Sequence, residues 1–585
     1  MFVKQGIAVS PGVAIGPAIL IGKNELQIPH RYLTGDVVDF EISRLHGALQ
    51  RVCEEIAEQE RLATEQLGAQ FAAIFGAHLL LARDKKLVQE IEEQIRKRRY
   101  APEQATQNVL RKRAGQLRAL SNSYIAERSL DLEDLEKRLL RHLVGEPHQE
   151  LSNLKTEAII LAHNLTPSET ASLDKKFIRA FATEVGGPTS HTAILAGALE
   201  IPAVVGLGQF LSEIGGGGET VIIDGNEGLI YIDPDEATIG RYRAIQAEEA
   251  ARASQLISRQ VVDDICTTAD GARVIVLGNI EFPEEAEHCQ ERGAEGVGLY
   301  RTEFLYLGHH KERTEDEHFQ AYKHVARTFG DAPVVIRTLD LGADKIPGNM
   351  HDYFSDFANP ELGMRSIRVS LANKRLFKTQ LRAVLRAAVE GNIWLMFPLV
   401  SSLLELRQAK MLVQDVCEDL EEENVTFRRK IPIGMMVEVP SAAIMADEFA
   451  REVDFFSIGT NDLIQYTLAA DRSDPAVARY YNAADPAILR LIEMVQKAGD
   501  EHKIPVTVCG QMCSDPKFVP LLMGVGVRRF SVTPPAILEI RDLVGRVTMP
   551  QVREIAARAR HMESARDIEA FLRGELRKIY QDNDY

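Results

Sequence analysis

Eight short apolar segments, each followed by a helix-like stretch, constrain the fold of this 585-residue chain more than any other feature. Alternating β and α segments build parallel βα units, and eight units in roughly 300 residues match the size of a (β/α)8 barrel. The expected strands are Val274–Gly278, Gly296–Tyr300, Val334–Thr338, Ile393–Pro398, Ile433–Val439, Asp454–Gly459, Pro505–Cys509 and Arg528–Val532. We therefore expect residues 261–585 to form a TIM barrel.

Polar and charged side chains follow the ends of these strands. The residues at the strand ends are Arg301, Arg337, Glu438, Asn461, Asp462 and Cys509, and Arg365 and Arg472 lie in loops close behind such ends. All strands of a barrel end on its C-terminal face, where barrel enzymes keep their active sites. Any single pair could be a salt bridge on the barrel rim. Carboxylates and arginines delivered together by five strands instead favour a site for a hard divalent cation and a small, multiply charged anion.

A second candidate site lies at Gly186–Leu195, which reads Gly-Gly-Pro-Thr-Ser-His-Thr-Ala-Ile-Leu. The glycines and proline predict a bend, and Thr189 and Ser190 are good N-cap residues for a helix that follows. His191 then falls in the first turn of that helix, where free N–H groups and the helix dipole favour an anion and a neutral imidazole. An isolated histidine there would more often cap or pack the helix.

The segments before the barrel fall into three regions. Residues 1–24 and 146–232 contain short β-type runs between Gly and Pro, so we expect them to form one α/β domain. Residues 25–145 carry apolar residues at helical spacing and predict a helical bundle inserted into that domain. Residues 233–260 are rich in Ala, Glu and Arg and predict a long linking helix.

The bundle also contains a basic cluster, whose members are Arg96, Lys97, Arg98, Arg99, Arg111, Lys112 and Arg113. Such a cluster is usually a solvated helix face, and a docking surface for an acidic partner is the alternative. The sequence alone leaves both interpretations open.

Composition narrows the class of protein. A net charge of -17 argues against a general nucleic-acid binder. No apolar run reaches the length of a membrane span, and the N-terminus shows no signal-peptide pattern. Six cysteines without paired metal-ligand spacing fit reduced thiols. We therefore expect a cytoplasmic enzyme that binds neither nucleic acid nor membrane.

The two candidate sites share one resemblance. The segment Gly186–Ala196, followed by Ile201–Gly206, resembles the phosphohistidine segment of the phosphoenolpyruvate (PEP)-utilising enzymes. That family includes Enzyme I of the sugar phosphotransferase system, pyruvate phosphate dikinase and PEP synthase. The barrel segments Gly298–Leu305, Arg337–Asp340, Gly434–Glu438 and Phe455–Thr467 are similar to the PEP-binding motifs of the Enzyme I branch.

The resemblance implies a role for each candidate residue. His191 would accept the phosphoryl group, and Cys509 would protonate the enolate to release pyruvate. The residues implied in binding PEP are Arg301, Arg337, Arg472, Asn461 and Asp462, with Arg365 as a further candidate. Glu438 and Asp462 would bind Mg²⁺, and the helical insertion would bind the phosphocarrier protein HPr. The family also implies a homodimer formed through the barrel.

The choice among family members rests on the region before His191. Dikinase and synthase carry an ATP-binding domain there, whereas this chain has a helical segment without a glycine-rich phosphate loop. This favours a PEP-protein phosphotransferase that passes the phosphoryl group to HPr. Because the chain starts at Met1, we expect no N-terminal sensory domain. A nitrogen-branch paralogue lacking that domain, a dikinase-like enzyme and a non-catalytic regulatory protein stay as alternatives.

Two positions depart from the usual family pattern. Pro188 stands where the sugar-system enzymes commonly have arginine, although proline also occurs. Gly197 stands where arginine is usual, one helical turn beyond His191 and close enough to steady its phosphate. The missing cation affects the lifetime or transfer rate of phosphohistidine without removing the nucleophile.

We predict that Gly197→Arg speeds phosphoryl transfer through His191 severalfold, because a guanidinium forms charge-assisted hydrogen bonds with phosphate. Rapid-quench measurement of phosphorylation by PEP would check this. An unchanged rate in the arginine variant would contradict the prediction.

Overall fold

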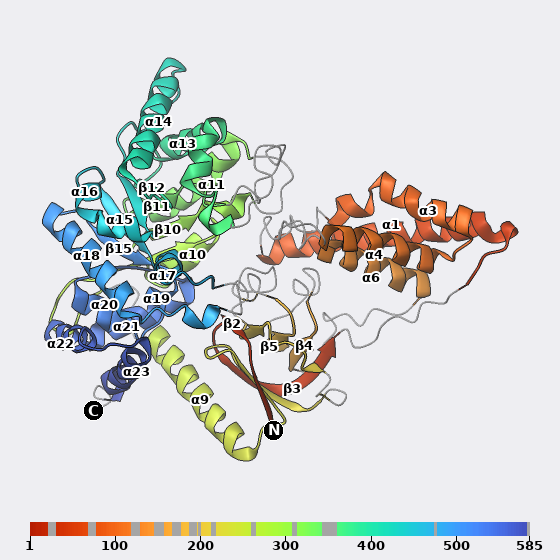
Figure 1. Cartoon of the computed structure of the whole chain (residues 1–585), viewed down its shortest axis with the longest axis horizontal. Coiled ribbons are helices and arrows are strands. Elements are labelled where there is room, and N and C mark those ends of the chain that lie inside the picture. The colour runs from red at the N-terminus through yellow and green to blue at the C-terminus, as the bar shows by residue number, and fades with distance from the viewer. Residues whose placement is uncertain are drawn as a thin grey trace. The chain divides into compact units, whose positions relative to one another are not determined.

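The computed structural model describes residues 1–21, 31–67, 78–118, 129–145, 157–165, 177–186, 196, 201–211, 214, 218–258, 265–306, 313–341, 360–472 and 477–581 (Figure 1). The chain divides into two compact units, Met1–Arg252 and Ala253–Tyr585. None of the helices in the described ranges combines the length and apolar composition that a bilayer crossing requires.

An eight-stranded mixed sheet forms part of the first unit. Its strands are β1 (Phe2–Gln5), β2 (Ile7–Ser10), β3 (Val13–Ile21), β4 (Ala158–Ala162), β5 (Ile178–Thr183), β6 (Ala203–Val205), β7 (Thr220–Asp224) and β8 (Leu229–Ile232). Their spatial order is β1-β8-β7-β3-β4-β5-β6-β2, with β3 to β6 parallel. Strand β3 pairs with both β4 and β7. The N-terminal strands and the later strands therefore form one sheet, although the helical segment separates them in sequence.

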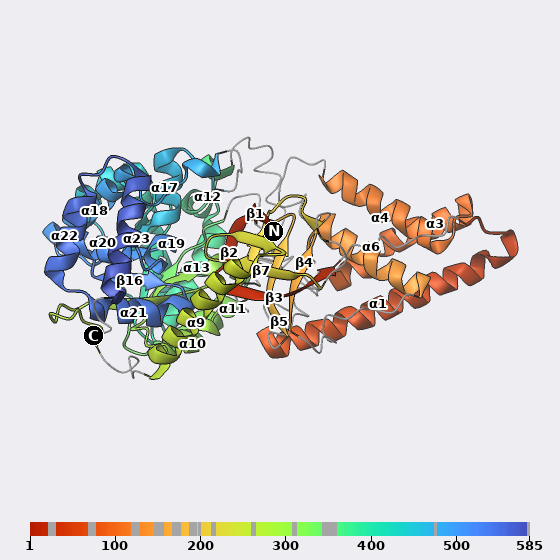
Figure 2. The ribbon, with the colours of Figure 1, turned by 90° about the horizontal axis from the view of Figure 1, so that it is seen from below.

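Four long helices of the first unit pack side by side (Figures 1 and 2). They are α1 (Val38–Leu67), α3 (Lys85–Arg98), α4 (Pro102–Arg118) and α6 (Ser129–Val144). The apolar stripe predicted on the first helix is buried, with Leu45, Val52 and Ile56 fully inaccessible. Helix α9 (Glu236–Ser258) occupies the segment expected to be a linking helix.

The basic cluster of the bundle is largely ion-paired. Its members Arg96, Lys97, Arg111 and Arg113 contact carboxylates at N–O distances from 2.8 to 3.4 Å. Ion pairs of this kind within the bundle favour the interpretation as a solvated helix face.

The second unit contains a closed barrel of eight parallel strands, as the sequence predicted. The strands are β9 (Ile275–Ile280), β10 (Val297–Arg301), β11 (Val334–Arg337), β12 (Ile393–Phe397), β13 (Ile433–Val437), β14 (Phe455–Gly459), β15 (Val506–Cys509) and β16 (Arg529–Val532). Strand β16 pairs with β9 and closes the barrel. Every predicted strand is present, with ends shifted by two residues or fewer.

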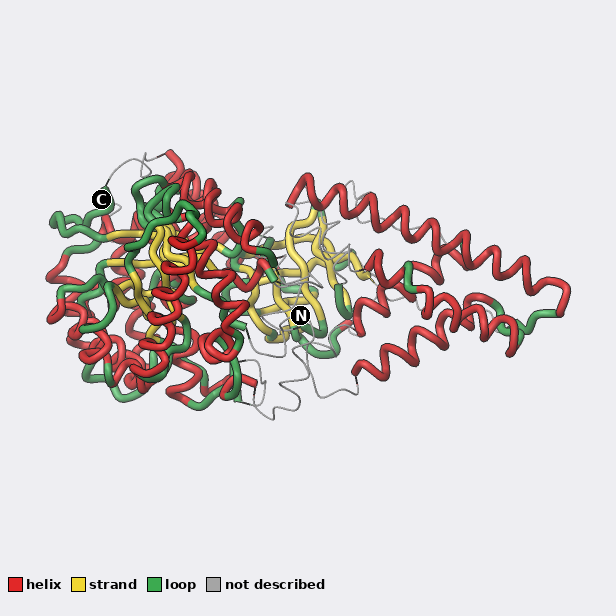
Figure 3. Tube along the Cα trace, turned by 90° about the horizontal axis from the view of Figure 1, so that it is seen from above, coloured by secondary structure: helices red, strands yellow, loops and turns green. Residues whose placement is uncertain are grey.

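Helices enclose the barrel strands (Figure 3). They are α10 (Glu285–Glu291), α11 (Glu315–Phe329), α12 (Ile367–Ala372), α13 (Lys374–Ala387), α14 (Leu403–Glu422), α15 (Pro440–Ile444), α16 (Ala446–Ala450), α17 (Thr460–Leu468), α18 (Pro486–His502), α19 (Gln511–Ser514), α20 (Val519–Val525), α21 (Ile537–Arg546), α22 (Met549–Ala559) and α23 (Ala565–Gln581). Short 3-10 turns occur at Gly35–Val37, Thr302–Leu305, Pro360–Leu362, Ala478–Tyr480 and Pro534–Ala536. Capping side chains such as Ser402 and Asp485 start these helices where the sequence places them.

The barrel strands are buried on both faces, which explains their continuous apolar composition. One set of side chains packs outward against the helices, as Val334 and Ile336 do. A second set fills the barrel interior and consists of Leu299, Val335, Met396, Met436, Phe455 and Cys509. The interior is therefore a packed core, and polar chemistry is left to its mouth.

Two helical glycines of the barrel unit lead to opposite predictions. A Cβ on Gly524 of α20 would overlap the Val552 carbonyl oxygen and crowd Ala556 of α22, whereas a Cβ on Gly574 of α23 would meet nothing within 4 Å. We expect Gly524→Ala to destabilise the unit by about 1–3 kcal/mol through overpacking. We expect Gly574→Ala to stabilise it by up to about 1 kcal/mol through helix propensity.

Urea unfolding followed by the fluorescence of Trp394, the single tryptophan of the chain, reports on the barrel directly. A gain in stability from Gly524→Ala would contradict the tight packing of α20 on α22.

Candidate active site

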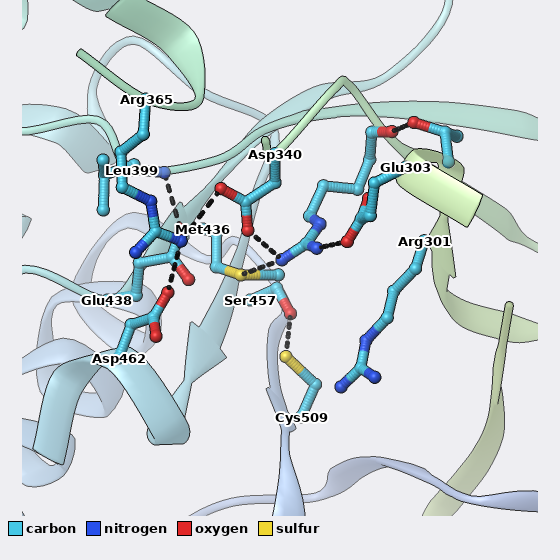
Figure 4. A network of polar contacts seen from close by, with 12 residues as sticks. Arg301, Glu303, Asp340, Arg365, Leu399, Met436, Glu438, Ser457, Asp462 and Cys509 are labelled. Atoms are coloured by element: carbon cyan, nitrogen blue, oxygen red, sulfur yellow. Dashed lines mark hydrogen bonds and ion pairs between the residues drawn. The ribbon is translucent and has the colours of Figure 1, made fainter. Parts of the chain in front are cut away.

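The C-terminal ends of five barrel strands bring the predicted side chains to one mouth of the barrel. Arg301, Arg337 and Cys509 are the last residues of β10, β11 and β15. Glu438 directly follows β13, and Asp462 lies in the first turn of α17, after β14. Figure 4 shows these side chains pointing toward one another from different strands.

Arg337 is a buried cation held by two carboxylates. Its Nη1 lies 2.9 Å from Asp340 Oδ2, and its Nη2 pairs with Glu303. Burial opposes the charge, but Glu303 and Asp340 outweigh it and raise the pKa of Arg337. The Nε atom of Arg337 is buried and has no hydrogen-bond partner among the described residues.

Arg365 links this ion pair to the next strand end. Its Nη2 lies 3.2 Å from both Asp340 Oδ1 and Asp462 Oδ2. Its Nη1 donates to the Tyr466 hydroxyl at 3.0 Å and pairs with Glu361. Burial alone would raise the pKa of Asp340, but the Arg337 and Arg365 guanidiniums hold it below its usual range. The result is a chain of alternating charges from Glu303 to Asp462.

Glu438 lies in surroundings that disfavour its ionised form. Its Oε1 accepts a hydrogen bond from the Leu399 amide at 2.6 Å. Burial, together with the carboxylates of Asp462 and Asp340, raises the pKa of Glu438 to about 8. The Arg337 guanidinium and the Leu399 amide act in the opposite direction but do not offset burial and the two neighbouring carboxylates.

The Glu438 and Asp462 pair fits a hard divalent cation. A Cβ at Gly459 would lie 2.7 Å from Glu438 Oε2, so the glycine leaves room for that carboxylate oxygen. Mg²⁺ binds one or two carboxylates and takes its other ligands from water and substrate. No group of three or more His, Cys, Asp or Glu suited to a metal occurs among the described residues. A two-carboxylate Mg²⁺ site completed by substrate oxygens agrees with that finding.

Cys509 is buried among the apolar side chains that fill the barrel interior. Burial raises the pKa of its thiol to about 11, while the Ser457 hydroxyl, at 3.3 Å from the sulfur, works in the opposite direction. Arg301 lies near the sulfur in Figure 4, and its Nη1 pairs with Glu281 at 2.7 Å. The cysteine is thus a protonated thiol that faces the cationic mouth.

Asn461 and Arg472 have contacts outside the ionic chain. Asn461 Oδ1 accepts from the Gln511 amide at 3.1 Å, and its carbonyl accepts from the Tyr481 hydroxyl at 3.2 Å. The Arg472 amide lies 3.4 Å from Gln465 Oε1, and its side chain interacts with Tyr481. Asn461 lies in the first turn of α17, directly after β14, and Arg472 lies shortly after the end of that helix.

His191, Pro188 and Gly197 lie outside the described residues. The nearest described positions on either side are Gly186, with a φ of 125°, and the buried Ala196. The bend expected at the glycines agrees with that φ value. The role of His191 stays a prediction.

A buried network that the sequence analysis missed supports the Arg337 strand end. Gln380 of α13 accepts from the Leu339 amide at 3.0 Å and donates to Thr302 Oγ1 at 2.9 Å. Thr302 in turn donates to the Arg337 carbonyl at 2.8 Å. Gln380 also contacts the Tyr322 hydroxyl at 3.1 Å. Gln380 and Thr302 together therefore hold the backbone from the Arg337 carbonyl to the Leu339 amide, directly after the arginine.

The network continues to a neutral histidine. The Tyr322 hydroxyl lies 3.0 Å from His318 Nδ1, and the Tyr306 hydroxyl lies 2.9 Å from its Nε2. Burial lowers the pKa of His318 to about 4, so the ring is uncharged at neutral pH. A polar residue within the apolar stripe of α13 was the sequence signal that could have revealed Gln380. Glu303 and Asp340 lay inside the motifs that carried the resemblance, but they had no assigned role.

Comparisons with known proteins agree with this geometry. The family model described as "PEP-utilising enzyme, PEP-binding domain" matches residues 257–549. Those described as "PEP-utilising enzyme, N-terminal" and "PEP-utilising enzyme, mobile domain" match residues 5–128 and 154–228. The chain therefore belongs to the PEP-utilising enzyme family.

Curated relatives narrow the family further. A phosphoenolpyruvate-protein phosphotransferase of Geobacillus stearothermophilus is 41% identical over 92% of this chain and 92% of its own length. One of Priestia megaterium is 40% identical over 97% of this chain and 98% of its own. A solution structure titled Enzyme I is 38% identical and covers 42% of this chain and 99% of its own, with a TM-score of 0.37. The resemblance inferred from the sequence, with its expectation of a phosphotransferase, is confirmed.

We predict that Gln380→Leu destabilises the barrel by about 2–4 kcal/mol, because it leaves the Leu339 amide and two hydroxyls buried without their partner. Urea unfolding monitored by Trp394 would measure the change. The neighbouring, partly buried Thr379, whose hydroxyl donates to the Arg375 carbonyl of the same helix, is the control, and Thr379→Ala should change stability by less than about 0.5 kcal/mol. Equal effects of the two substitutions would contradict the prediction.

Proposed function

We propose that this protein is a PEP-protein phosphotransferase, which moves the phosphoryl group of PEP to His191 with release of pyruvate and then to the phosphocarrier HPr. The observation that carries the proposal is the linked set of Arg337, Arg365, Glu438 and Asp462 at the barrel mouth. The printed name of the curated relatives at about 40% identity supports the same reaction.

The arginines of the mouth bind the trianionic substrate. Arg337 and Arg301, at the ends of adjacent strands, take the phosphate, with Arg472 and Arg365 as further contacts. Guanidinium groups match phosphate and carboxylate oxygens with paired N–H donors. Asn461 and Asp462 hold the rest of the molecule from the start of α17. Phosphoryl transfer depends chiefly on such positioning and charge stabilisation.

Glu438 and Asp462 hold the Mg²⁺ ion. When bound, the ion neutralises substrate charge and fixes the orientation of substrate oxygens. Burial, together with the Asp462 and Asp340 carboxylates, raises the pKa of Glu438, and a bound cation would favour its ionised form.

His191 is the phosphoryl acceptor and Cys509 the acid that protonates the enolate. The bond from phosphorus to the enol oxygen breaks as His191 attacks, and the enolate that remains takes a proton from the thiol. The thiol faces the mouth and is protonated at neutral pH, as this role requires. His191 belongs to the α/β region, so transfer requires that this region reach the barrel and then the acceptor.

The remaining assignments concern organisation. The phosphohistidine domain comprises residues 1–24 and 146–232, and the HPr-binding helices comprise residues 25–145. The linking helix covers residues 233–260, and the barrel covers residues 261–585. We further propose a cytoplasmic homodimer formed through the barrel. The curated names do not separate sugar-system from nitrogen-branch carriers.

We predict that PEP with Mg²⁺ labels the wild-type protein and leaves His191→Ala unlabelled, because only histidine 191 provides the nucleophile. Radiolabelled PEP, acid and alkali treatment and a pyruvate assay would measure the reaction. An acid-labile, alkali-stable label with release of pyruvate is the expected result, and added HPr should then remove the label.

Two outcomes would contradict the proposal. Label on His191→Ala would place the phosphoryl group elsewhere. Labelling of the wild type from ATP and not from PEP would favour a dikinase-like reaction.

A further inference from the structure

Ser457 is a buried residue whose hydroxyl contacts Cys509, the proposed proton donor. The proposed function gives this serine no role. It lies on β14, is 1% exposed, and its Oγ donates to Cys509 Sγ at 3.3 Å (Figure 4). Among the described residues its Oγ has no other hydrogen bond. The hydroxyl therefore has a single partner, and that partner is the sulfur.

Strand pairing explains why these two side chains meet. In the β14–β15 register Ser457 is opposite Thr507 and Gly459 is opposite Cys509. Ser457 and Gly459 share the interior face of β14 because strand side chains alternate. Ser457, two residues before Gly459 on that face, reaches the sulfur diagonally across the strand pair.

The sulfur makes a second, longer hydrogen bond, in which it is the donor and not the acceptor. Cys509 Sγ lies 3.4 Å from the Ile458 carbonyl oxygen and donates to it as a thiol. That contact is lost when the thiol gives up its proton, whereas the contact with Ser457 grows stronger. A hydrogen bond from a hydroxyl to an anion is stronger than one to a neutral acceptor.

We propose that Ser457 is a positioning residue for proton transfer by Cys509: its hydroxyl orients the thiol and stabilises the thiolate that remains after the proton has left. This inference rests on the proposed function. Arg301 on β10 and Arg337 on β11 add favourable charge at the sulfur, and Glu438 after β13 opposes it. Cys513 of α19 also lies near the sulfur and is uncharged.

The proton transfer balances within the site. The S–H bond of Cys509 breaks with its electron pair left on sulfur, and the C=C pair of the enolate forms the new C–H bond. The enolate oxygen pair becomes the carbonyl of pyruvate, and solvent water returns a proton to the thiolate. The reverse transfer removes a methyl proton of pyruvate and exchanges it with solvent.

Deuterium exchange isolates this step. Wild type, Ser457→Ala, Ser457→Thr, Ser531→Ala and Cys509→Ala are incubated with pyruvate and Mg²⁺ in D₂O, and methyl deuteration is followed by NMR. Ser531 is the matched control: it is fully buried on β16 and donates to Gly278 and Asn279. We expect Ser457→Ala to slow exchange at least about tenfold relative to Ser531→Ala, and threonine to restore it.

The outcomes separate the two proposals. If Cys509→Ala exchanges as fast as wild type, the proposed role of Cys509 fails. If Cys509→Ala is inactive and Ser457→Ala equals Ser531→Ala, the role of Ser457 alone is overturned.

Alkylation of Cys509 tests the effect of Ser457 on the thiol without requiring the enzyme to catalyse a reaction. Iodoacetamide labelling is read by mass spectrometry on the Cys509 peptide as a function of pH, with the buried Cys513 as internal reference. The pH at which the labelling rate of Cys509 is half-maximal should rise by about one unit in Ser457→Ala and stay unchanged in Ser531→Ala. An unchanged midpoint overturns the proposal. Trp394 fluorescence verifies that each variant is folded. If Ser457→Ala misfolds, Ser457→Cys takes its place, because cysteine is similar in size to serine and its thiol is a weaker hydrogen-bond donor.

Discussion

The buried guanidinium of Arg337 is the charge on which the mouth of the barrel depends. A cation removed from water is costly unless carboxylates and hydrogen bonds surround it. Here Glu303 and Asp340 supply the charge, and Gln380 and Thr302 hold the backbone from behind. Because Asp340 also contacts Arg365, and Arg365 contacts Asp462, the position of one arginine determines that of residues on three further segments.

This arrangement also brings carboxylates close together. Glu438 is buried beside Asp462 and Asp340, and burial together with these two carboxylates raises its pKa. The mouth thus combines ion-paired arginines, whose guanidiniums can bind an anion, with neighbouring carboxylates that can bind a cation. PEP with Mg²⁺ has that combination of charges, which is the physical basis of the proposed function.

The proposed proton donor, Cys509, differs from these charged residues in its surroundings. Cys509 belongs to the interior packing with Leu299 and Met436, and burial keeps its thiol protonated. Ser457 is placed where a thiolate could form at lower cost. In the proposed function the arginines of the mouth bind the phosphate and Cys509 transfers the proton, and the ends of barrel strands position both groups.

The sequence by itself determined the elements and the ends of the strands, because eight apolar runs between helix-like segments permit few alternatives to a barrel. It also singled out Arg301, Arg337, Glu438, Asp462 and Cys509 as candidates, because each lies at or just after the end of a predicted strand, and the structure brings their side chains to one mouth of the barrel. It did not reveal Gln380, Ser457 or the Asp340 bridge. Their roles depend on which side chains meet across strands far apart in the chain, and only closure of the barrel decides those contacts. The spacing of residues along one strand predicts which face of the sheet a side chain occupies. The register with the neighbouring strand decides which side chain it contacts there.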